Sequence, residues 1–237
     1  TLIAEAEEGN SKAQYELGIL YDNGIGVSQN YKKALRLYER ASNQGHAKAQ
    51  YNLGHLYAEG LGTKRNYKKA AEWYRAASEQ DIEEAQYNLG NLYVEGLGVK
   101  QSYEEAFYWY NKAAKRKYAK AEYNLGVLHA NGTGIPKDLK ASVKLYKRAS
   151  KKGYADAQFN LGMSYASGAG VSQNYKKAIK WFRKSADQNL AVAQYNLGVL
   201  YKDGIGIPIN IQEAYFWLTL AAENDNNSTN AEALRGA

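Results

Sequence analysis

The chain has 237 residues, 45% of them hydrophobic, and a formal net charge of +7 from 31 basic and 24 acidic side chains. It has no cysteine, which excludes a disulfide framework and a thiolate metal site. No apolar run approaches the ~18 residues of a membrane span, so we expect no membrane insertion.

One stretch of the sequence recurs six times in register. It reads AQYNLGHLYAEGLGT from Ala49, and its leading alanine returns every 36 residues from Ala13 to Ala193. A fixed period of this length is typical of stacked helical repeats. We therefore divide the chain into the end of a truncated preceding repeat (1–8), six repeats (9–224), and a C-terminal cap or disordered tail (225–237). Because the chain begins with threonine and not methionine, we expect it to be a fragment or a processed product.

The first helix of each repeat is predicted from its apolar spacing. In the first repeat it covers about residues 12–23, where Ala13, Leu17, Leu20 and Tyr21 share one face of a 3.6-residue period. A glycine lies beside that face in every repeat, although glycine costs roughly 1 kcal/mol against alanine inside a helix. We therefore expect another helix backbone to come close at these glycines, which are Gly18, Gly54, Gly90, Gly126, Gly162 and Gly198.

A turn and a capped second helix follow. Gly24 and Gly26 end the first helix of the first repeat, as glycine does after a helix C-terminus. The second helix is expected to begin after a side-chain N-cap, at Asn30, Asn66, Ser102, Asp138, Asn174 and Asn210. It should end in a left-handed residue near Gly45, whose equivalents include Asp81, Asn189 and Lys117. Lysine suits that conformation least.

The run A-x-x-x-L-G-x-x-Y-x-x-G-x-G, with an alanine- and aromatic-rich second helix after it, resembles the Sel1-like repeat family, which is related to tetratricopeptide repeats. The resemblance covers essentially the whole chain. It implies an all-α, right-handed superhelical solenoid of helix-turn-helix units that acts as a non-catalytic adaptor or scaffold in protein complexes. Family members are common in bacterial envelopes and among host-interaction proteins, which favours a periplasmic or secreted location while leaving the compartment open.

A catalytic constellation is missing from the sequence. The three histidines, His46, His55 and His129, have no metal-ligand spacing. The glycine turns lack the context of a nucleotide site, and the Ser-x-x-Lys and Lys-Thr-Gly motifs of β-lactam hydrolysis do not occur. We therefore predict no enzyme, no metal and no cofactor. An accessory protein or enzyme of cell-envelope glycan metabolism is the alternative.

Two rows on the first helices predict a partner site. If these helices line the concave groove, as the resemblance implies, a peptide or protein would meet asparagines, aromatic rings and an apolar floor. The alternative is that the asparagines hydrogen-bond between repeats. The predicted groove residues are Tyr51, Asn52, Tyr87, Asn88, Val94, Tyr123, Asn124, Val127, Phe159, Asn160, Met163, Tyr195, Asn196 and Val199.

Residues 112–152 hold 12 basic and 2 acidic side chains. Lys144, Lys147 and Lys151 of this stretch are predicted to attract an acidic partner or an anionic surface, unless they form a solvated outer face. Specific nucleic-acid binding is not expected, because aromatic and basic residues do not alternate on one face. We expect a monomer.

Overall fold

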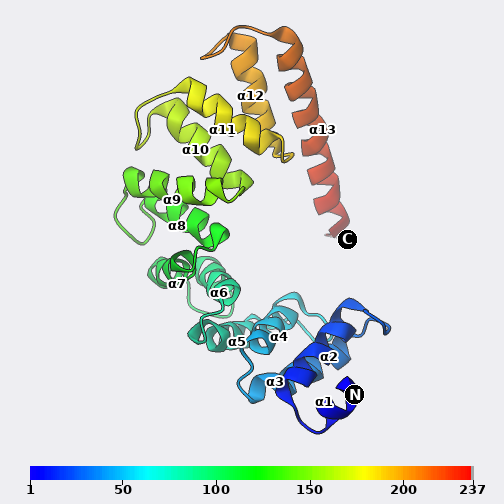
Figure 1. Cartoon of the computed structure of the whole chain (residues 1–237). Coiled ribbons are helices and arrows are strands. Elements are labelled where there is room, and N and C mark those ends of the chain that lie inside the picture. The colour runs from blue at the N-terminus through cyan, green and yellow to red at the C-terminus, as the bar shows by residue number, and fades with distance from the viewer. Residues whose placement is uncertain (236–237) are drawn as a thin grey trace. The chain divides into compact units, whose positions relative to one another are not determined.

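The computed structural model describes the backbone of residues 1–235 and the side chains of residues 1–225. Over this part of the chain all regular secondary structure is α-helical, in thirteen helices (Figure 1). The prediction of an all-α chain of helix-turn-helix repeats is confirmed. The chain divides into two compact units, Thr1–Tyr118 and Ala119–Ala237.

Unit 1 consists of a short helix and three helical hairpins. Its helices are α1 (Leu2–Glu7), α2 (Ser11–Asn23), α3 (Tyr31–Asn43), α4 (Ala47–Glu59), α5 (Tyr67–Glu79), α6 (Glu83–Glu95) and α7 (Tyr103–Lys115). The hairpins are α2–α3, α4–α5 and α6–α7, and each packs on the next because α3 contacts α4 and α5 contacts α6.

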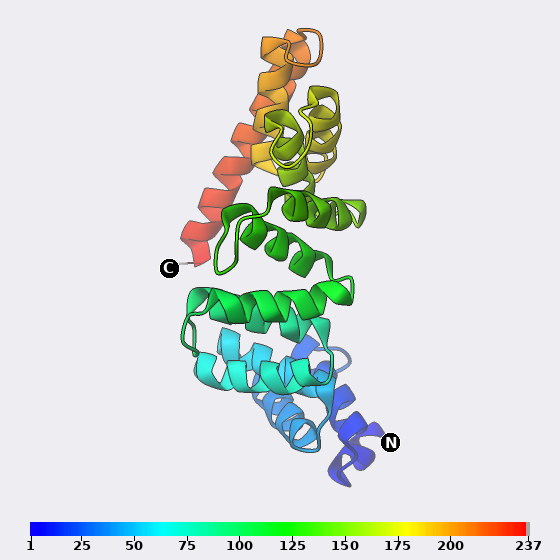
Figure 2. The same cartoon turned by 90° about the vertical axis from the view of Figure 1, so that its left-hand side faces the viewer.

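Unit 2 repeats this arrangement. Its helices are α8 (Ala119–Asn131), α9 (Leu139–Lys151), α10 (Ala155–Ser167), α11 (Tyr175–Ala186), α12 (Ala191–Asp203) and α13 (Ile211–Arg235). The hairpins are α8–α9, α10–α11 and α12–α13, and Figure 2 shows them from a second side. The α13 helix runs past residue 225. The side chains of residues 226–235 and all of residues 236–237 lie outside the described part, so a cap or tail at 225–237 stays a prediction.

The predicted N-caps of the second helices are confirmed in all six repeats. The side-chain oxygen of each cap accepts a hydrogen bond of 2.9–3.2 Å from the backbone N–H three residues later. Each bond satisfies one amide that the first helical turn leaves without a backbone partner.

The left-handed ends of the second helices are also confirmed. Gly45 and Gly153 have φ values of 82° and 89°, while Asp81, Lys117 and Asn189 have φ values of 64–65°. Lysine takes this conformation although its side chain disfavours it. The N–H groups of Lys117 and Tyr118 bond to the carbonyls of Ala114 and Ala113, which closes the end of α7.

The glycine inside each first helix marks the closest contact within a hairpin. A Cβ atom added there would lie 2.6–2.7 Å from a side chain of the second helix. Its neighbour is a tyrosine ring in four repeats, Phe182 in the fifth and Leu218 in the sixth. The expected helix contact is therefore present. The expected backbone comes close at two of the six glycines, where the carbonyl oxygens of Ala70 and Ala214 lie 3.3 and 3.2 Å from a Cβ atom added at Gly54 and Gly198, but the nearest atoms at all six belong to a side chain. In five of the six repeats an aromatic ring of the second helix fills the space beside the glycine, because a larger residue in the first helix would overlap the ring.

We expect Gly90→Ala to lower the free energy of unfolding by ~1–3 kcal/mol, because the new methyl group would overlap the Tyr110 ring. The same change in a Tyr110→Ala background should instead raise this free energy by up to ~1 kcal/mol, since alanine is the better helix former. Urea unfolding of the four proteins measures both effects. Destabilisation of equal size in both backgrounds would contradict the ring contact.

Candidate partner-binding face

The exposed side of the first helices forms one face in each unit, here called the first-helix face. In unit 1 it is carried by α2, α4 and α6, and in unit 2 by α8, α10 and α12. The predicted asparagine and aromatic rows stand on these helices. Their members are half-buried, except Tyr195, which is 56% exposed.

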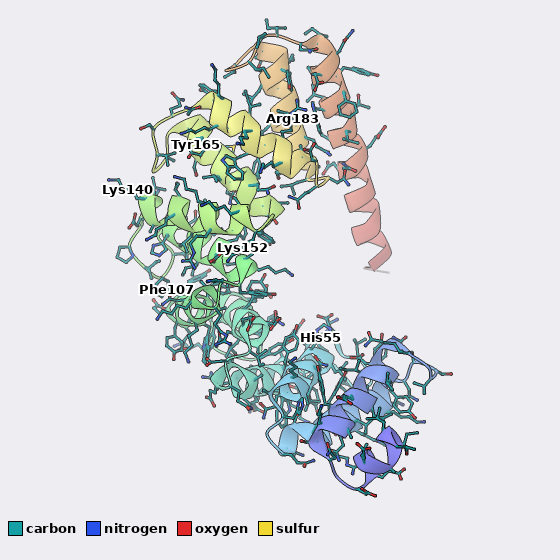
Figure 3. The ribbon with its side chains drawn as sticks, in the orientation of Figure 1. His55, Phe107, Lys140, Lys152, Tyr165 and Arg183 are labelled. Atoms are coloured by element: carbon teal, nitrogen blue, oxygen red, sulfur yellow. The ribbon has the colours of Figure 1, made fainter. Side chains whose placement is uncertain are left out.

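Each unit has a hollow on this face. The unit 1 hollow, of about 410 Å³, is lined by Tyr51, His55, Ala58, Glu59, Tyr67, Tyr74, Asn88, Asn91, Leu92, Glu95 and Leu97. The unit 2 hollow, of about 210 Å³, is lined by Ala130, Leu139, Ser142, Tyr146, Asn160, Met163, Ser164, Ser167 and Ala169. Most residues of the second list stand two repeat periods, 72 residues, after residues of the first. Figure 3 labels His55 on α4.

In the first five repeats, the aromatic row on the first helices packs against the rings of the second helices. The ring centroids of Tyr51 and Tyr74 are 5.9 Å apart, and those of Phe159 and Phe182 are 5.6 Å apart. Burial raises the pKa of Tyr51, and the Glu84 carboxylate adds to the rise. These rings therefore belong partly to the core, and each leaves only a part of its surface for a partner.

The asparagine row forms hydrogen bonds to the preceding repeat where tyrosine hydroxyls are available. Asn52 bonds to the hydroxyl of Tyr38, and Asn88 bonds to those of Tyr74 and Tyr51. The amide of Asn160 lies 3.5 Å from the hydroxyl of Tyr123 and also bonds to Tyr146.

Asn196 differs, because the repeat before it carries Phe159 and Phe182 at the two positions where other repeats have a tyrosine hydroxyl. Its amide donates instead to the carbonyl of Val192 in its own helix, at 2.7 Å. The bonds of Asn52, Asn88 and Asn160 support the alternative that the row links repeats. This role still leaves each amide at the edge of the first-helix face.

This difference gives a matched pair of substitutions. We expect Asn88→Ala to lower the free energy of unfolding by about 1 kcal/mol, because it removes hydrogen bonds to the preceding repeat. Asn196→Ala should be neutral or slightly stabilising, since it removes only a bond within one helix and alanine favours the helix. Urea unfolding measures both. If both substitutions lower the free energy of unfolding equally, the hydrogen bonds between repeats contribute no stability of their own.

The four predicted floor residues are not equally accessible. Met163 is 41% exposed and lines the unit 2 hollow. Val94 and Val199 are half-buried. Val127 is also half-buried and packs against the core residues Val143, Tyr146 and Leu161. Met163 is therefore the floor residue that offers a partner the most apolar surface.

A ladder of buried glutamines was not predicted from the sequence. Its members donate to a backbone carbonyl eight residues earlier at 3.1–3.3 Å, and they are Gln14, Gln50, Gln86, Gln158 and Gln194. In four repeats their side-chain oxygen also accepts a bond of 2.8–2.9 Å from an amide 30 residues later. The recurrence of glutamine after the leading alanine was the available signal.

The fourth repeat replaces this amide pair by charges. Glu122 is fully buried, and its carboxylate lies 2.6 Å from the Lys152 ammonium and 2.7 Å from the Arg148 guanidinium. Figure 3 labels Lys152 at the end of α9. Two of the basic residues of the 112–152 stretch therefore neutralise a buried carboxylate.

The three lysines predicted to form an acidic-partner patch are placed differently from one another. Lys144 and Lys151 are exposed, whereas Lys147 is half-buried. The Lys147 ammonium lies 5.7 Å from the centroid of the Tyr165 ring in the next repeat. This patch therefore offers two exposed cations.

The charged pair of the fourth repeat allows a repair experiment. We expect Lys152→Met to lower the free energy of unfolding by ~1–3 kcal/mol, because the buried Glu122 carboxylate loses a charged hydrogen-bond donor. The double change Glu122→Gln with Lys152→Gln should restore stability to about that of the starting protein. It recreates the pair of Gln158 and Gln188, which are joined at 2.8 Å. Thermal unfolding compares the three proteins, and a double variant as unstable as the single one would argue against the ladder.

Among the described residues, no three histidine, cysteine, aspartate or glutamate side chains gather closely enough to hold a metal ion. His46 stacks on Tyr15 at 4.5 Å and caps α4, and burial lowers its pKa. In the same part of the chain, every helix is too short or too polar to cross a membrane.

Comparison with known proteins identifies the repeat. The Sel1 repeat profile matches six consecutive segments, residues 11–46, 47–82, 83–118, 119–154, 155–190 and 191–226. The boundary between the two units thus falls between the third and fourth repeats. A comparison with curated proteins finds no match.

Solved structures share the fold. A protective antigen of uropathogenic Escherichia coli strains is 33% identical with a TM-score of 0.89, over 96% of this chain and 49% of the antigen. This chain therefore spans about half the length of that protein. A Sel1 repeat protein from Oxalobacter formigenes is 37% identical with a TM-score of 0.82, over 90% of this chain and 85% of its own. An immunity protein from Pseudomonas aeruginosa, 22% identical with a TM-score of 0.53, is similar in fold alone, over 91% of this chain and 82% of its own.

Proposed function

The chain belongs to the Sel1 repeat family, and from this premise we propose that it binds a segment of a partner protein on its first-helix face. Sel1 repeat proteins generally mediate protein–protein interaction. The observation that carries the proposal is the hollow that both units have at the same position of the repeat. No side chain of the described residues fills either hollow.

The lining of the hollows suits a peptide. Tyrosine rings offer stiff contact area with a polar tip, and the half-buried asparagines stand beside them. In unit 2, Met163 adds a flexible apolar side chain next to Asn160 and Tyr146. A few apolar contacts at the centre would supply most of the affinity, with the polar groups setting register.

The acidic-partner alternative receives less support. Arg148 and Lys152 are taken by the buried Glu122, and Lys147 lies against Tyr165. Only Lys144 and Lys151 of the predicted patch extend into solvent. For the alternative of an enzyme of envelope glycan metabolism, the described residues offer no cluster that could hold a metal ion.

A peptide-display selection tests the proposal. Random peptides of about 15 residues are selected on the intact protein, and the enriched sequences are synthesised for binding measurements. We expect Met163→Glu to weaken the binding of these peptides by at least about tenfold, because it places a charge on an apolar contact. Circular dichroism should remain helical, since residue 163 is exposed on α10.

The matched control is Lys144→Glu with Lys151→Glu, which changes the charge of exposed α9 positions and should leave peptide binding unchanged. The proposal is wrong if no peptide is enriched. The proposal is also wrong if peptides still bind after Met163→Glu and after substitutions in the unit 1 hollow, but no longer bind after Lys144→Glu with Lys151→Glu.

A further inference from the structure

We propose that the unit 1 hollow receives a cationic side chain, lysine or arginine, of the bound segment. This inference rests on the proposed function and adds the chemistry of the ligand. Two carboxylates line the hollow, those of Glu59 and Glu95, and both residues are exposed. Neither takes part in an ion pair of the described residues.

The two carboxylates stand where they do not help their own helices. Glu59 is the last residue of α4 and Glu95 is the last residue of α6. The C-terminus of a helix carries a partial negative charge, so an acidic side chain there is unfavourable to the helix. The ends of both helices add their partial negative charge to that of the carboxylates, and a cation in the hollow would be stabilised by all four.

Aromatic rings complete the complementarity. Tyr51, Tyr67 and Tyr74 line the same hollow. The face of a tyrosine ring attracts a cation, and Arg65 already places its guanidinium 5.9 Å from the centroid of Tyr67. The charge of Glu59 acts on the Tyr74 ring. Burial is the largest cause of the raised pKa of Tyr74, followed by Tyr51, and Glu59 raises it further.

The unit 2 hollow shows that the repeat does not require these charges. The residue equivalent to Glu95 is Ser167, the equivalent of Asn91 is Met163, and no carboxylate lines this hollow. The same place in the fold thus has an anionic, aromatic lining in unit 1 and a neutral, more apolar lining in unit 2. We infer that the two hollows accept different side chains, a cation in unit 1 and an apolar group in unit 2.

Two peptide libraries test this inference. Both contain peptides of about 12 residues, random over uncharged residues, with a fixed central arginine in one library and a fixed central methionine in the other. We expect the intact protein to enrich the arginine library, and Glu59→Gln with Glu95→Gln to weaken binding of its peptides about tenfold. The imidazole NMR signals of His55, in the lining of the hollow, should shift when an arginine peptide is added.

The matched control is Glu79→Gln with Glu105→Gln, which removes two exposed carboxylates of unit 1 outside the hollow. It should keep the preference for arginine. Peptides of the methionine library should lose affinity with Met163→Glu and keep it with Glu59→Gln and Glu95→Gln.

The possible failures are distinguishable. If the intact protein binds both libraries equally well, or if the control lowers arginine binding as much as the hollow variant does, the inference is wrong and the proposed function stands. If the protein enriches neither library, the inference and the proposed function are both wrong.

Discussion

In five of the six hairpins, a contact between a glycine of the first helix and a ring of the second holds the two helices together, and Leu218 takes the place of the ring in the sixth. At Gly90 the Tyr110 ring occupies the space that a side chain on the first helix would take, which brings the two helices close. The glycine weakens its own helix, and the buried ring offsets this cost through packing. The ring also carries a hydroxyl in four repeats, and the hydroxyls of Tyr38 and Tyr74 meet an asparagine of the next hairpin of unit 1.

Polar side chains then fix how one hairpin sits on the next within each unit. The glutamine ladder is buried and bonds to backbone carbonyls, while the asparagine row bonds to tyrosine hydroxyls at the edge of the first-helix face. Such bonds contribute little net stability individually, but an unmade one inside the core is costly. They therefore specify register. In the fourth repeat, Glu122 and Lys152 replace the amide pair of the ladder by charges within one hairpin.

The two hollows are a consequence of this packing, and their chemistry varies independently of it. Rings and asparagines that link the repeats also form the walls, so the walls persist from one unit to the other. Other lining residues differ between the units, such as Glu95 in unit 1 and its equivalent Ser167 in unit 2. The fold can thus repeat while the surface that a partner meets changes along the chain.

The sequence by itself determined the period, the two helices of each repeat, the N-caps and the left-handed ends, because these depend on residues within one turn of each other. It also placed the asparagine and aromatic rows on one helix face. Only the tertiary structure decided that a side chain of the second helix lies closest to each glycine, and that Asn88 bonds to Tyr74 whereas Asn196 bonds within its own helix. The tertiary structure also decided that Lys152 pairs with the buried carboxylate of Glu122. Apart from Asn196 and Val192, these partners lie between 14 and 30 residues apart, so the local pattern of the sequence cannot pair them; the packing of one helix on another does.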